Sequence, residues 1–97
     1  MIEGTTSTGF RFSFDERRLD DMRIVDLIAE IDNPDSSAFI KARGASQLIT
    51  MLLGADLKAA LYEHIGAVNE GRVPQADLEN ALAEIMAGAG KDAEKNS

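Results

Sequence analysis

The clearest local pattern near the start of the chain is an alternation of aromatic and polar residues. Phe10, Phe12 and Phe14 are each separated by one polar residue. Because the side chains of a strand point alternately to opposite faces, the three rings share one face of an extended segment at residues 10–14. No second segment has an equally strand-like pattern, so the backbone of this strand has no obvious partner. Residues 1–9, rich in Gly, Thr and Ser, are expected to be flexible.

The remainder of the chain repeats an apolar spacing of three and four residues, which is typical of amphipathic helices. The stripes predict helices over roughly residues 19–32, 38–53, 57–68 and 74–89, with Pro74 in the first turn of the last one. The sequence therefore predicts a mainly α fold, a small bundle of about four short helices with an N-terminal extended β segment. We expect a single domain at residues 10–89, followed by a flexible tail at residues 90–97.

Three residues mark the expected helix boundaries and irregularities. Pro34 ends the first helix, because proline disfavours helical geometry in the residue before it. Gly54 is placed to end the second helix, and Asp56 is placed to cap the third. Gly44 lies within the second helix, where it either permits close packing or marks a bend.

Charge and composition narrow the classes of function. The net charge is −7, from 17 acidic and 10 basic residues, which opposes binding to nucleic acids and to anionic membranes. The chain contains no cysteine, so disulfides and thiolate chemistry are excluded. No apolar run approaches the roughly 20 residues of a membrane span, and no signal-peptide pattern is present, so the cytoplasm is the expected location.

The residues that could carry chemistry favour structural interpretations. His64 is the single histidine, and no second histidine or cysteine is available to share a metal, so a boundary or surface role is expected. The acidic residues at 15–21 lack the glycine of a calcium loop and are interrupted by arginines, which favours a solvated helix start. No serine–histidine–acid arrangement and no phosphate loop is recognisable. We expect no enzymatic activity, no cofactor and no metal.

Two other functions remain open at this stage. Ser36, in an Asp-Ser-Ser sequence before a helix, could be the attachment serine of an acyl-carrier-like protein. However, carriers have Leu after that serine and a longer preceding loop, so helix capping is favoured. A small phage regulatory or adaptor protein, with a helix-turn-helix at about residues 53–68, is opposed by the acidic balance.

The order of segments along the chain resembles that of a known family. The segments that carry the resemblance are the aromatic segment at 9–15, the acidic helix at 20–32, the Asn33-Pro34-Asp35 turn, Leu52-Leu53-Gly54, the helix around 57–64, Gly71-Arg72-Val73-Pro74, Leu82-Ala83-Glu84-Ile85 and the terminal Lys95-Asn96-Ser97. In this order they resemble the small tail assembly chaperones of long-tailed bacteriophages, especially those of phages and prophages of Gram-positive bacteria. The similarity covers residues 9–97. Arg43-Gly44-Ala45 departs from it by interrupting the second helix.

The resemblance implies a non-enzymatic protein of the host cell cytoplasm. Such chaperones bind the tape measure protein, help to recruit the tail tube protein and are absent from the finished virion. In many phages a ribosomal frameshift near the end of the reading frame extends a minority of copies. The residues that we expect to contact protein partners are Phe10, Phe12 and Phe14, through a free strand edge, and Met22 and Met51, through adaptable side chains. A homo-oligomer is also possible on this basis.

Overall fold

The structure is a computed structural model that describes the backbone of residues 1–95 and the side chains of residues 1–88. The described chain is mainly helical, as predicted. Its elements in order are β1 (Ile2–Thr5), β2 (Arg11–Phe14), the 3-10 helix η1 (Glu16–Leu19), α1 (Met22–Asp32), α2 (Ala38–Gly66) and α3 (Gln75–Lys95). None of the described helices has the combination of length and apolar character needed to cross a bilayer.

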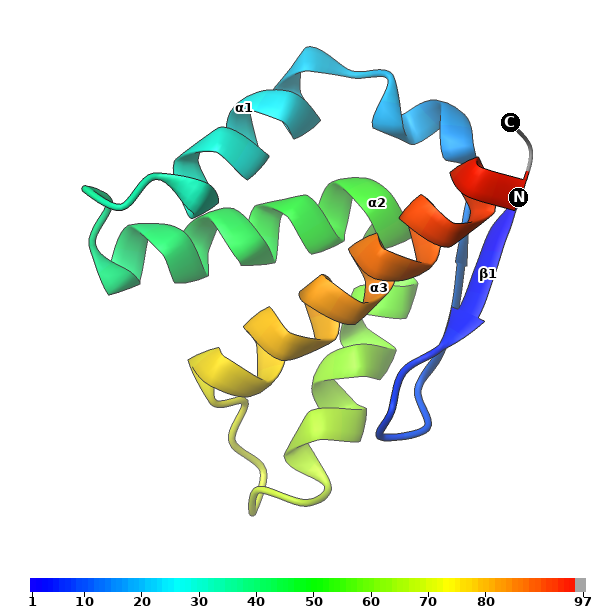
Figure 1. The fold of residues 1–97 in the computed structure, drawn as a ribbon. Helices are drawn as coiled ribbons and strands as arrows, with labels where there is room; N and C mark the ends of the chain where they lie inside the picture. Colours follow the sequence, from blue (N-terminus) through cyan, green and yellow to red (C-terminus); the bar gives the residue numbers. More distant parts are fainter. Residues whose placement is uncertain (96–97) are drawn as a thin grey trace.

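The long helix α2 is the centre of the arrangement. α1 packs along its N-terminal half, and α3 also packs against α2 (Figure 1). The two strands form an antiparallel hairpin beside these helices, in which β1 contacts α3 and β2 contacts α2. Residues from every one of these elements except η1 contribute to one buried apolar core.

The hairpin corrects the expectations for residues 1–9. Ile2–Thr5 forms β1, and its register with β2 pairs Ile2 with Phe14 and Gly4 with Phe12. The expected loose segment is therefore a strand at these residues, and the aromatic strand pairs within the chain. The physical reason is burial, since the Ile2 side chain lies in the core at 3% exposure. Thr6 holds the connecting loop, because its hydroxyl accepts the Phe10 N–H at 3.1 Å.

The rings of Phe12 and Phe14 in β2, and of Phe10 just before it, lie inside the protein. Phe10, Phe12 and Phe14 are all buried, and β2 packs against α2. The Phe12 ring fits between two glycines, Gly4 of β1 and Gly88 of α3. A Cβ atom added to Gly4 would lie 2.7 Å from the ring, and one added to Gly88 would lie 3.4 Å from it. The absence of a side chain at both positions therefore leaves space for the ring.

The number of α-helices is three in residues 1–95, so the prediction of four was wrong. The second and third predicted helices are parts of α2, which continues through Gly54 with a kink. Gly54 has φ 84° and ψ 169°, so it interrupts the helical geometry as expected, but helical residues resume directly after it. The side chain of Arg18 donates to the carbonyl oxygen of Leu52 at 2.7 Å. This bond supplies a partner to a carbonyl in the turn before the kink.

Gly44 permits close packing between α1 and α2. It is buried within the regular part of α2, and an added Cβ atom would lie 3.0 Å from Cγ1 of Ile31. Of the two interpretations offered by the sequence, the structure favours close packing, because the only non-helical backbone inside α2 is at Gly54.

Candidate functional site

A groove of about 420 Å³ lies between α1, α2 and α3. All three helices contribute to it, because α1 and α3 each pack against α2 and leave part of its surface between them. Its lining residues are Ile28, Ile31 and Asp32 from α1, Lys41 and Leu48 from α2, and Glu79, Leu82, Ala83 and Met86 from α3. We call this feature the α1–α3 groove.

The α1–α3 groove has an apolar interior and charged groups on each of its helices. Leu48 of α2 is almost fully buried at 1% exposure and belongs to the core, so that core is continuous with the groove. Asp32 is on α1, Glu79 is on α3 and Lys41 is on α2. Such a surface can bind an apolar partner through burial while its charges select the orientation of that partner.

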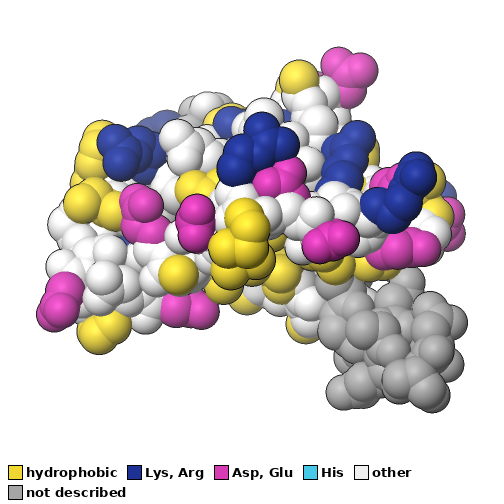
Figure 2. Space-filling view, turned by 90° about the horizontal axis from the view of Figure 1, so that it is seen from above, with side chains coloured by type: hydrophobic (Ala, Val, Ile, Leu, Met, Phe, Trp, Pro, Cys, Tyr) yellow, Lys and Arg dark blue, Asp and Glu magenta, His cyan; other side chains and the backbone are white. Residues whose placement is uncertain are grey.

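Exposed hydrophobic side chains extend the apolar surface of α1. Met22 and Val25 are 68% and 47% exposed. Val25 lies one turn before Ile28 and about 60° from it around the helix axis, so it extends the apolar surface next to the groove, whereas Met22 lies about 120° from Ile28. Figure 2 shows hydrophobic patches between acidic and basic side chains on the face seen from above. The exposure of Met22 is compatible with a contact role, which stays a prediction.

The other residues expected to bind partners lie elsewhere. Met51 is half-buried and lines a separate hollow between α1 and α2, with Arg23 and Leu27. The rings of Phe10, Phe12 and Phe14 are in the core and offer no side-chain surface to a partner. The structure therefore does not bring the five predicted residues together. The sequence analysis missed the groove itself, although the apolar spacing on the three helices supplied its lining residues.

A second hollow, of about 310 Å³, lies beside the hairpin loop and includes His64. The His64 Nε2 atom lies 3.1 Å from the Thr8 hydroxyl. The centroid of the His64 ring lies 5.7 Å from the centroid of the Phe10 ring. The backbone N–H of Ser7 donates to the Glu84 carboxylate at 3.0 Å. These contacts tie the loop to α2 and α3, which is a structural role for His64. Among the described residues, no group of three or more histidine or acidic side chains is arranged to hold a metal ion.

The residues behind the two alternative functions have local structural roles. Ser36 lies in the turn between α1 and α2, where its N–H donates to the carbonyl of Asn33 at 3.1 Å. The residue that caps α2 is Ser37, whose hydroxyl accepts the Ile40 N–H at 3.2 Å. At residues 53–68, the structure has the kink at Gly54 and one helical segment that ends at Gly66. It does not have the two helices joined by a turn that the adaptor hypothesis placed there.

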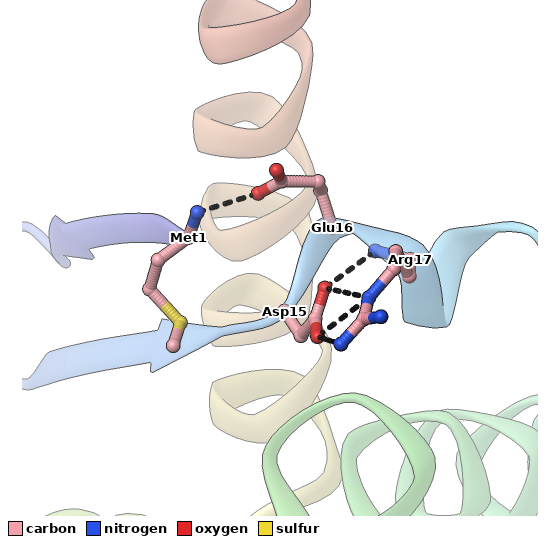
Figure 3. Close-up of polar contacts among 4 residues, drawn as sticks. All are labelled: Met1, Asp15, Glu16 and Arg17. Atoms are coloured by element: carbon pink, nitrogen blue, oxygen red, sulfur yellow. Dashed lines mark hydrogen bonds and ion pairs between the residues drawn. The ribbon is translucent and has the colours of Figure 1, made fainter.

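The acidic residues at 15–21 cap helices, in agreement with the sequence analysis. Asp15 is the N-cap of η1 and Asp21 is the N-cap of α1. The Asp15 carboxylate accepts hydrogen bonds from the side chain and the backbone N–H of Arg17, and Glu16 pairs with the Met1 amino group at 2.7 Å (Figure 3). The hydrogen bonds from the Arg17 side chain, followed by its backbone N–H, lower the pKa of Asp15 from 3.8 to about 2.

The first prediction concerns this carboxyl group. Since its pKa is lowered in the folded state, its stabilising effect is present above pH 3.8 and is lost as the pH falls toward about 2. Replacing Arg17 with glutamine should raise the pKa of Asp15, whereas the Arg72→Gln control should leave it unchanged. Carboxyl carbon NMR titrations of the three proteins measure this. An Asp15 pKa in Arg17→Gln that equals the wild-type value would show that the side-chain bonds do not form in solution.

The chain was compared with protein families, curated proteins and solved structures, and no family model, curated protein or solved structure matches it.

Proposed function

We propose that this protein is a phage tail assembly chaperone. In this role it binds the tape measure protein in the host cytoplasm, helps to recruit the tail tube protein around it and is absent from the finished virion. The activity is binding and involves no catalysis and no cofactor. Two things support the proposal, the order of sequence segments that resembles this family and the apolar surface that the folded chain leaves accessible.

The observation that carries the proposal is an accessible apolar surface on an acidic protein. The α1–α3 groove and the exposed Met22 and Val25 offer hydrophobic contact to a client segment. The net charge of −7 makes complexes of client and chaperone repel one another, which opposes aggregation. A protein that holds a long, aggregation-prone client during assembly needs both properties.

Co-expression with the tape measure protein encoded in the same phage or prophage genome tests this function. We expect the soluble fraction of the tape measure protein to rise several-fold when this chain is present, and the two proteins to co-purify. An unrelated acidic helical protein of similar size, expressed at the same level, is the control and should have no effect. If the tape measure protein is no more soluble with this chain than with the control, the proposed function is wrong.

A further inference from the structure

We propose that the α1–α3 groove is the docking site for one amphipathic α-helix of a partner protein, with Lys or Arg residues beside its apolar stripe. The assignment of that helix to a phage assembly client rests on the proposed function. Three properties of the partner helix follow from the groove: its backbone conformation, its apolar side chains and its charged side chains.

The backbone of the groove favours a helical occupant. All three of its walls are helices, whose peptide groups in regular turns are bonded within the same helix. A bound extended segment would find no free row of N–H and C=O groups to pair with, and its own backbone would lose water without compensation. An α-helix satisfies its backbone internally and contributes only side chains. The groove therefore selects helix-in-groove binding over strand addition.

The apolar side chains of the groove have a spacing that fits a helix stripe. Ile28 and Ile31 on α1 and Leu82 and Met86 on α3 are spaced three and four residues apart, so each wall presents a row along its helix. Val25, which is solvent-exposed, lies one turn before Ile28 and extends the wall on α1. A partner helix with leucines at positions i, i+3, i+4 and i+7 would cover these side chains, as one more helix packed against α2.

The charges favour a basic helix. Asp32 and Glu79 lie on different walls, and Lys41 is the only basic residue among the described lining residues, which together carry one net negative charge. No ion pair holds either of these carboxylates within the described part of the chain. Lys or Arg residues beside the apolar stripe of a partner would pair with them. A second copy of this chain is disfavoured as the occupant, because each copy carries a charge of −7.

Binding of a designed peptide tests the site directly. The probe is a fluorescein-labelled helical peptide of about 18 residues, or five turns, with leucine at i, i+3, i+4 and i+7 and lysine beside this stripe. A second peptide has glutamate in place of each lysine. Fluorescence polarisation should show binding of the lysine peptide and about ten-fold or more weaker binding of the glutamate peptide. Equal binding of the two peptides would overturn the proposed charge selection.

A blocking variant locates the binding site. Ala83 lines the groove but is exposed, so Ala83→Arg should fill the groove without disturbing the core. We expect this substitution to weaken binding of the lysine peptide by about ten-fold or more. Ala59→Arg makes the same change at an exposed helical position outside the groove and should bind like the wild type. Circular dichroism checks that both variants are folded. Unchanged binding by Ala83→Arg would overturn the proposal.

A charge-reversal pair separates specific pairing from general attraction to an acidic protein. Asp32→Lys combined with Glu79→Lys should weaken binding of the lysine peptide and strengthen binding of the glutamate peptide. Glu3→Lys combined with Glu63→Lys changes the net charge equally at exposed positions outside the groove and should have little effect. If both double variants weakened binding of the lysine peptide equally, the proposed site would be wrong. A wild-type homodimer that Ala83→Arg dissociates would identify a second copy as the occupant and overturn it too.

The co-expression experiment distinguishes this inference from the proposed function. If the wild type and Ala83→Arg keep the tape measure protein equally soluble, the groove is not the client site, although the chaperone function stands. If the wild type leaves that client insoluble while the lysine peptide still binds in the groove, the proposed function fails and the docking site stands. Loss of client solubility with Ala83→Arg, but not with Ala59→Arg, supports both.

Discussion

Replacing Phe12 with alanine is expected to lower the free energy of unfolding by about 3–5 kcal/mol, the usual cost of removing a buried phenylalanine. The ring is 6% exposed and lies between Gly4 of the hairpin and Gly88 of α3. It also stacks near Phe14, with ring centroids 6.5 Å apart. Phe12 therefore joins the two-stranded hairpin to the helices.

The cost should be near the upper part of this range because two neighbours of the ring, Gly4 and Gly88, cannot fill the space that it leaves. The residues on the two sides of the ring are glycines, which have no side chain that could move into the cavity. A two-stranded hairpin is at best marginally stable alone, so loss of the ring also weakens the attachment on which both strands depend. The hairpin should then unfold together with the contact between β1 and α3.

Urea denaturation followed by circular dichroism measures the effect. Phe39→Ala is the matched control, because this phenylalanine is 69% exposed and its removal should change stability by less than about 0.5 kcal/mol. If Phe12→Ala is unfolded without urea, Phe12→Leu gives a measurable loss, expected at about 1–2 kcal/mol. A Phe12→Ala protein as stable as Phe39→Ala would contradict the placement of the ring.

Local periodicity explains the parts of the fold that the sequence predicted. The alternation at residues 10–14 depends only on the two-residue repeat of a strand, and it predicted the shared face of the three rings, which is buried in the structure. The apolar stripes likewise predicted α1 and both halves of α2, because a helix repeats its contacts within a few residues. Asp15 and Asp21 were recognisable as helix-start residues from their local charge pattern.

The features that the sequence did not reveal depend on contacts between distant residues. β1 is four residues long and contains Gly4, so it has no strand-like alternation, and its position follows from pairing with Phe12 and Phe14. The α1–α3 groove likewise depends on how α1 and α3 cross α2, which apolar spacing within each helix does not determine. Met22 was predicted to be a contact residue from its chemistry, and the structure added only its exposure.

Gly54→Ala is expected to lower the free energy of unfolding by about 1–3 kcal/mol, because of backbone conformation and not because of crowding. The φ of 84° and ψ of 169° lie in a region that is essentially restricted to glycine. The space is open, since the nearest atom to an added Cβ would be an Arg18 guanidinium nitrogen at 4.0 Å. Alanine also favours a straight helix at this position, which would misalign the two halves of α2 with the elements that they contact.

The same substitution elsewhere in α2 should have the opposite effect. Gly66 ends the helix with ordinary helical geometry, and an added Cβ would make van der Waals contacts of 3.6 Å with Gly71. Gly66→Ala should therefore be neutral or stabilising by up to about 1 kcal/mol, the gain in helix propensity. Thermal and urea unfolding of the two variants measure the contrast, and a Gly54→Ala protein at least as stable as Gly66→Ala would contradict the kink.

D-Alanine at position 54 isolates the cause. A chain of 97 residues is accessible to chemical synthesis, and a D-residue favours positive φ as an L-residue favours negative φ. Its methyl group would occupy the mirror-related position on the α-carbon while restricting the unfolded chain more than glycine does. If the handedness of the backbone at Gly54 sets the kink, the D-alanine protein should unfold at a urea concentration close to or above that of the wild type. The L-alanine protein should unfold at a lower one, because the two differ only in the configuration of a single carbon.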